Sequence, residues 1–126
     1  MLGRVNSRLE ATLQVELGSP NGQLQLVTLV IDTGFNGHLA LPEALVASLG
    51  LPLLAAADAT LADGREVPVS LFAGVVSWDG VRRDVIAVQT EGGMLLGMAL
   101  LEGSRLRIDV ASGGEVLVDR LPSPSA

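Results

Sequence analysis

The chemistry available to this chain is that of carboxylates, because the other catalytic side chains are almost absent. The sequence has no cysteine and no lysine, and its one histidine is His38. Thiolate catalysis and cysteine-based zinc sites are therefore excluded, and a single histidine cannot make a metal site by itself. No Gly-x-Ser-x-Gly segment accompanies His38, and no lysine is present for a phosphate-binding loop. The sequence predicts no metal and no cofactor.

Asp32 differs from the other acidic residues in its surroundings. It follows the apolar run Leu29-Val30-Ile31, and Thr33 and Gly34 come directly after it. A carboxylate at the end of a buried strand needs hydrogen bonds. Thr33 supplies a hydroxyl, and Gly34 allows a tight turn that aims backbone N–H groups at the acid. The plainer interpretation is that Asp32 only opens a turn, as aspartate often does.

Composition predicts one soluble domain that associates with itself. The chain has 126 residues, of which 48% are hydrophobic and 17% charged. We expect one domain over residues 1–120 and a flexible tail over residues 121–126, and the scarcity of charges favours a homodimer. The net charge of −6 argues against nucleic acid and against an anionic membrane surface. Without a signal peptide or an apolar stretch long enough to span a bilayer, the predicted location is cytoplasmic.

The hydrophobic pattern predicts a mostly β fold with one or two short helices. Alternation or apolar runs favour strands at residues 9–17, 23–31, 38–41, 94–96, 105–110 and 115–119. A helix should begin at Pro42 and stop at Gly50, and a turn or two of helix should cover residues 99–102. Two Asp-Gly pairs, Asp63-Gly64 and Asp79-Gly80, predict hairpin turns.

In order and spacing, these elements resemble the retropepsin-like (clan AA) aspartic peptidases. That family has an apolar strand, Asp-Thr-Gly, a short strand, a hairpin flap, an apolar-apolar-Gly segment, a helix and a closing strand. Here the two motifs read Asp32-Thr33-Gly34 and Leu95-Leu96-Gly97, and the resemblance covers roughly residues 23–110. It implies a closed β-barrel that acts as a homodimer.

The resemblance also implies an activity and a role for each matching residue. The chain has one Asp-Thr-Gly, so a two-fold dimer would pair Asp32 with its twin, and the pair would activate water to hydrolyse a peptide bond. Thr33 would join the two loops through hydroxyl hydrogen bonds, and Gly34 would keep the loop open to substrate. The remaining implied site residues are the flap tip, Ala62, Asp63 and Gly64, which would close over a bound peptide, and Leu96 and Gly97, which would brace the loop from behind.

One departure from the family pattern keeps other functions open. The residue after Asp-Thr-Gly is usually Ala or Ser, and here it is Phe35, which would border the substrate cleft and affect substrate range. A catalytically weak or inactive dimer that binds peptides on the same fold is the alternative, and a structural β domain is a third. His38 could tune the acid pair or be an ordinary strand histidine, whereas Trp78 is interpreted as a packing residue at a hairpin end.

Overall fold

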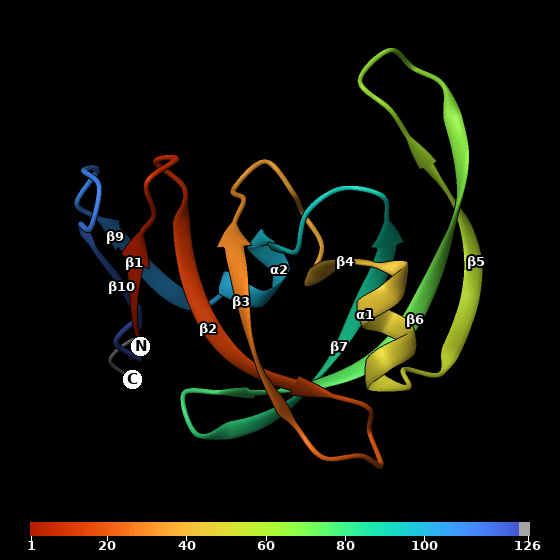
Figure 1. Cartoon of the computed structure of the whole chain (residues 1–126), viewed down its shortest axis with the longest axis horizontal. Helices are drawn as coiled ribbons and strands as arrows, with labels where there is room; N and C mark the ends of the chain where they lie inside the picture. Colours follow the sequence, from red (N-terminus) through yellow and green to blue (C-terminus); the bar gives the residue numbers. More distant parts are fainter. Residues whose placement is uncertain (124–126) are drawn as a thin grey trace.

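Within residues 1–123, ten strands form one sheet and two short helices accompany it (Figure 1). The structure is a computed structural model that describes residues 1–123. The strands are β1 (Leu2–Val5), β2 (Ala11–Gly18), β3 (Gln25–Ile31), β4 (Leu39–Pro42), β5 (Leu53–Thr60), β6 (Glu66–Trp78), β7 (Val81–Thr90), β8 (Leu95–Leu96), β9 (Ser104–Ile108) and β10 (Glu115–Arg120). The helices are α1 (Glu43–Leu49) and α2 (Met98–Leu101). The predicted mostly β fold with short helices is confirmed.

The sheet is not the closed barrel that the family resemblance implied. Its strand order is β5-β6-β7-β4-β8-β3-β2-β1-β10-β9, and an additional pairing joins β6 to β2. That pairing bends the middle of the sheet into a ring, but it covers only the end of β2, from Glu16 to Gly18. Within the described residues β5 and β9 remain edge strands. The barrel stays open because both ends of the sheet continue past the place where β2 and β6 meet.

The two Asp-Gly pairs lie in hairpin turns of different kinds. Asp79 and Gly80 have φ angles of 52° and 81° and connect β6 to β7 in a two-residue loop between Trp78 and Val81. Two successive positive φ angles are typical of a type I′ turn. In the other hairpin only Gly64 has a positive φ, 85°, and the loop is longer. Both turns were predicted from sequence, and both are confirmed.

Helix α1 begins and ends close to the predicted residues. Pro42 is extended, with φ −72° and ψ 156°, so it is the residue before the first turn rather than the first helical residue. Gly50 ends the helix in the left-handed region at φ 65°, and its N–H donates to the carbonyl of Ala47 at 3.0 Å. This ending is the one that glycine makes easiest.

Apolar side chains from both halves of the sheet, α1 and α2 form one core. Leu13, Leu29, Leu41 and Leu100 are among its fully buried members. No polar or charged side chain is buried within residues 1–123. The core therefore holds by packing of apolar groups, nearly all of them aliphatic, and no acidic residue of the described chain is buried in it.

The start of the expected tail is attached to the body of the protein. Leu121 has no regular secondary structure, but its N–H donates to the carbonyl of Gly103 at 2.8 Å, so this first residue of the expected tail is attached to the body. Residues 124–126 of that tail lie outside the described residues. Among residues 1–123 no helix has the length and apolar character needed to cross a bilayer. The cytoplasmic location stays a prediction.

Candidate functional site

The Asp32 loop is a tight turn that orients the carboxylate. Strand β3 ends at Ile31, and the N–H of Gly34 donates to Oδ1 of Asp32 at 2.9 Å. The N–H of Phe35 donates to the backbone carbonyl of Asp32 at 3.1 Å, which closes the turn. A side chain at position 34 would crowd the acid, since a Cβ there would lie 3.2 Å from Asp32 Oδ1. The predicted N–H contact to the acid is confirmed.

Asp32 is more exposed than the apolar residues before it in the sequence led us to expect. Its side chain is half-buried, and Thr33 and Gly34 are exposed. The apolar run before it fills the core through Leu29 and Ile31, but the strand reaches the edge of the core at Asp32. Water can therefore reach the carboxylate, and the acid does not depend on a buried partner.

Strand β8 lies between β3 and β4 and holds both ends of the Asp32 loop. It runs parallel to β3 and antiparallel to β4. The N–H of Asp32 donates to the carbonyl of Leu96 at 2.9 Å, and the N–H of Gly97 donates to the carbonyl of His38 at 2.9 Å. Leu96 is fully buried. Leu96 and Gly97 are thus bonded to the two ends of the loop, and their role in supporting a catalytic site stays a prediction.

Gly97 allows the loop and α2 to approach closely. A Cβ at this position would lie 2.8 Å from the carbonyl oxygen of Phe35 and 2.6 Å from its ring, and it would also collide with the carbonyl of Gly37. The first N–H groups of α2 complete the contact, with Met98 donating to the carbonyl of Phe35 at 2.8 Å. Only a residue without a side chain fits here.

Phe35 is accommodated by the glycines of its own loop. A Cβ at Gly37 would lie 2.6 Å from Cζ of the Phe35 ring, and the ring also faces Gly97. The ring is half-buried and lines a different cavity from Asp32. Phe35 stands where the family usually has Ala or Ser, and its ring is accommodated because both residues that it contacts, Gly37 and Gly97, lack side chains. The ring therefore packs against its own loop.

Two separate hollows border the loop. Asp32 and Thr33 line a depression of about 480 Å³ together with Leu9 and Val110. Phe35 lines a much larger groove of about 1420 Å³ between α1, the β5–β6 hairpin and the end of β7. The depression at the acid and the large groove therefore share no lining residue.

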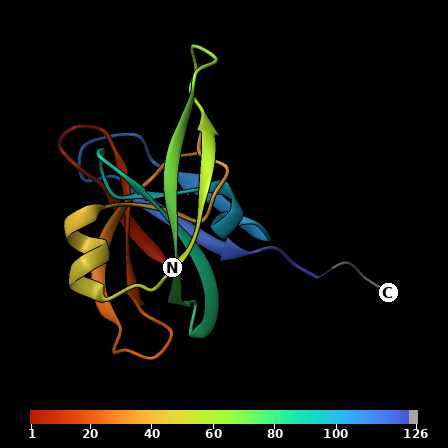
Figure 2. The same ribbon diagram turned by 90° about the vertical axis from the view of Figure 1, so that its right-hand side faces the viewer.

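The predicted flap tip lies away from Asp32. Ala62, Asp63 and Gly64 form the exposed turn of the β5–β6 hairpin, which projects beyond the body of the molecule (Figures 1 and 2). Arg65 steadies this turn, since its Nε donates to Asp63 Oδ2 at 2.7 Å. The backbone N–H of Arg65, which donates to Asp63 Oδ1 at 3.0 Å, and then the Arg65 side chain hold the pKa of Asp63 below its usual range. The three tip residues line neither hollow, so their contact with a substrate stays a prediction.

His38 acts as a hydrogen-bond acceptor in the sheet. Its Nδ1 accepts the N–H of Ile86 at 3.0 Å, beside the parallel pairing of β4 with β7. Burial lowers the pKa of His38, and the positive charge of Arg83 lowers it further. Both effects favour the neutral ring, which is the form that can accept this hydrogen bond. His38 directly precedes β4, and its side chain binds the backbone of β7, a contact that the sequence did not reveal. A role of His38 in tuning an acid pair stays a prediction.

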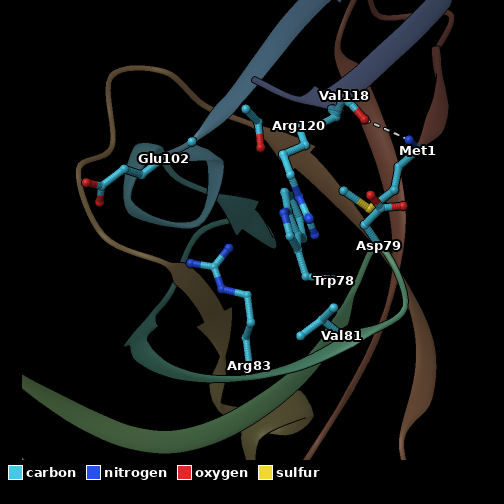
Figure 3. A pocket seen from close by; sticks show the side chains of 10 residues that line it. Met1, Trp78, Asp79, Val81, Arg83, Glu102, Val118 and Arg120 are labelled. Carbon is cyan, nitrogen blue, oxygen red and sulfur yellow. Dashed lines mark hydrogen bonds between the residues drawn. The ribbon is translucent and has the colours of Figure 1, made fainter. Parts of the chain in front are cut away.

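A cavity elsewhere in the molecule is lined by acidic and basic side chains, among them Asp79, Arg83 and Arg120 (Figure 3). It has a volume of about 300 Å³ and lies between the β6–β7 turn, the end of α2 and β10. Trp78 is buried here, with the guanidinium of Arg83 at 5.9 Å from its ring centre. The same guanidinium donates to the carbonyl of Leu100 at 3.1 Å. Trp78 is a packing residue at a hairpin end, as predicted.

The fold and the loop define a class of structure: a mostly β protein with two short helices and one carboxylate fixed at the end of a central strand. Within residues 1–123 no three His, Cys, Asp or Glu side chains are grouped so that they could hold a metal ion. No protein-family model matches the chain, and a search of curated proteins found no match either.

Proposed function

We propose that two copies of this chain form a two-fold dimer that hydrolyses peptide bonds, in the manner of retropepsin-like aspartic peptidases. The two Asp32 carboxylates of the dimer would together activate the attacking water. The observation that carries the proposal is the build of the Asp32 loop. Its carboxylate is oriented by the Gly34 N–H and remains accessible, and β8 holds the loop from behind at Leu96 and Gly97. An oriented carboxylate in contact with water suits general acid–base catalysis.

The chemistry follows from placing two such acids together. Two carboxylates within hydrogen-bonding reach cannot both ionise, so the pair retains one proton and titrates as a unit. The ionised Asp32 removes a proton from a water molecule, whose oxygen attacks the peptide carbonyl carbon. The protonated Asp32 of the second copy donates to the carbonyl oxygen. Collapse of the tetrahedral intermediate breaks the C–N bond, and the amine leaves with a proton from the pair.

The surface around Asp32 supports association through this face. Leu9 is 61% exposed and Val110 is 74% exposed, and both border the depression that contains Asp32 and Thr33. The turns that carry them lie along the same upper rim as the β3–β4 loop in Figure 1. Large apolar side chains around a functional group are typical of an interface. A two-fold axis passing near Asp32 would cover them with the same side chains of the second copy.

The test compares wild type with Asp32→Asn on an unfolded protein and on fluorogenic peptides from pH 4 to pH 7. We expect the variant to lose cleavage and to keep its circular dichroism spectrum and its sedimentation as a dimer. Asp84→Asn is the matched control, because it removes an exposed carboxylate of β7 that lines neither the depression nor the large groove. Equal cleavage by Asp32→Asn and wild type would refute the proposal, and so would a wild type that sediments as a monomer.

A peptide-binding dimer without hydrolysis is the second candidate. The observation that favours it is the separation of the large groove, which Phe35 lines, from the depression that contains Asp32. In that case wild type and Asp32→Asn bind peptides equally, and neither cleaves them over several days. Fluorescence anisotropy with intact-mass analysis of the peptide separates this candidate from the peptidase.

A further inference from the structure

The large groove has a distinctive combination of small apolar and acidic side chains. Its walls come from α1, the lower part of the β5–β6 hairpin and the end of β7. Alanines project from two of these walls, Ala44 and Ala47 from α1 and Ala57 and Ala59 from β5. Valine and leucine side chains of β6 complete the surface. Because the alanines are short, the groove keeps a volume of about 1420 Å³.

The charges that line this groove are all negative. Glu43, Asp58 and Glu91 contribute exposed carboxylates, and no arginine lines the groove. The salt bridges within residues 1–123 join Arg65 to Asp63 and Arg107 to Glu115, so none of the three groove carboxylates has an ionic partner there. Glu43 lies in α1, Asp58 lies in β5, and Glu91 directly follows β7. An occupant therefore meets negative charge from every wall.

We propose that this groove binds an extended peptide segment of another protein that carries a bulky apolar side chain next to lysine or arginine. The apolar side chain would fill the space left by the four alanines, where burial of its surface is favourable. The basic side chains would lie near Glu43, Asp58 and Glu91, where opposite charges improve selectivity and speed association. This inference rests on the proposed function and names its substrate class.

The first experiment measures the peptide preference. Three peptides share a central phenylalanine flanked on both sides by Lys, by Gln or by Glu, and Asp32→Asn is used so that binding is measured without cleavage. At low salt we expect the Lys peptide to bind roughly tenfold more tightly than the Gln peptide, and the Glu peptide to bind more weakly still. The preference should shrink as ionic strength rises, because exposed charges are screened. Equal affinities for the Lys and Glu peptides would overturn the proposal.

The second experiment tests whether the groove carboxylates cause the preference for the Lys peptide. Combining Glu43→Gln, Asp58→Asn and Glu91→Gln should remove most of the selectivity for Lys over Glu. Glu66→Gln is the control, since it lies on the same hairpin and does not line the groove. Ala47→Phe, which fills the groove from an exposed helical position, should weaken binding of the phenylalanine peptide more than binding of an alanine analogue. If the triple variant keeps the wild-type preference, the charges act elsewhere and the proposal fails.

Cleavage by the wild-type protein distinguishes this inference from the proposed function. Cleavage of all three peptides with equal kcat/KM would leave the peptidase proposal standing and overturn the groove proposal. Selective binding of the Lys peptide without cleavage would support the groove proposal and count against hydrolysis.

Discussion

Replacing Gly97 by alanine tests whether close contact behind the Asp32 loop holds the loop in place. The added Cβ would lie 2.8 Å from the carbonyl oxygen of Phe35 and would also strike the carbonyl of Gly37. Both obstacles are backbone atoms, so a rotation of one side chain cannot relieve them. The loop must move from α2, which weakens the hydrogen bonds from Gly97 and Met98 to the loop carbonyls.

The magnitude follows from two opposing terms. Overpacking of this kind costs about 1–3 kcal/mol, and contact with backbone points to the upper half of that range. Alanine also restricts the unfolded chain, which stabilises the folded protein by about 0.4–1 kcal/mol. The net loss in free energy of unfolding is therefore about 1–2.5 kcal/mol. For a chain of this size it corresponds to a fall in Tm of roughly 3–10 °C.

Urea unfolding followed by circular dichroism measures this loss, and Gly93→Ala is its matched control. Gly93 precedes the same strand β8, its φ is not positive, and nothing lies within 4 Å of a Cβ built there. We expect Gly93→Ala to leave the stability unchanged or to raise it by up to about 1 kcal/mol. Gly97→Ala should also reduce any peptide cleavage, because it displaces the loop that positions Asp32. If the two variants unfold at the same urea concentration, the loop does not depend on this contact.

Two further predictions concern His38, which follows the Asp32 loop, and Gly80 in the β6–β7 turn. Protonation of His38 would remove the acceptor of the Ile86 N–H. The pKa of His38 is lowered from 6.5 in the folded state. The unfolded chain therefore binds this proton more readily than the folded chain does. The free energy of unfolding should fall as pH drops below about 6.5 and level off below the folded-state pKa, and His38→Gln should flatten this part of the pH profile in chemical denaturation. Gly80→Ala should destabilise the protein by about 1–2 kcal/mol in thermal unfolding, because Gly80 has a φ of 81°, whereas the exposed Ser112→Ala should change stability little.

Local sequence patterns predicted the hairpin turns and the Asp32 loop. They did not predict a strand that forms only because neighbouring strands pair with it. The Asp79-Gly80 turn and the ending of α1 at Gly50 are set by the φ preferences of those residues, so sequence reveals them. Strand β1 was not predicted, because its four residues include Gly3 and Arg4 and show no apolar alternation. It is a strand because β2 and β10 bind it on both sides.

The alternation at residues 9–17 was misleading at its first residue. Leu9 matches the apolar pattern, yet it has a φ of 61° in the turn before β2. The side chain of Asn6 holds that turn by accepting the N–H groups of Arg8 and Glu10 at 3.0 and 2.9 Å. A pattern of side chains cannot report such a turn, because it depends on hydrogen bonds to one asparagine.

Strand β5, which forms one wall of the large groove, also could not be predicted from its local sequence. Its sequence is rich in alanine, which has little preference for strands, and nearly all of it is exposed. Pairing with β6 makes it a strand, from Leu53↔Phe72 to Thr60↔Glu66. The wall of the groove was therefore not predictable from local sequence, although the turn at its tip was.

The path of β6 explains why the groove and Asp32 can be tested separately. Pairing of β6 with β7 begins at Leu71, so the residues from Glu66 to Ser70 pair only with β5. Beyond Leu71 the same strand continues into the body and reaches β2 at Val75. A change in the tilt of the hairpin would therefore alter the width of the groove first, because the hairpin forms one of its walls. The Asp32 loop is held by β8 and α2 instead, and none of its backbone hydrogen bonds involves the hairpin. A variant in the hairpin should accordingly change which peptides bind, and a variant at Gly97 should change how the acid is placed.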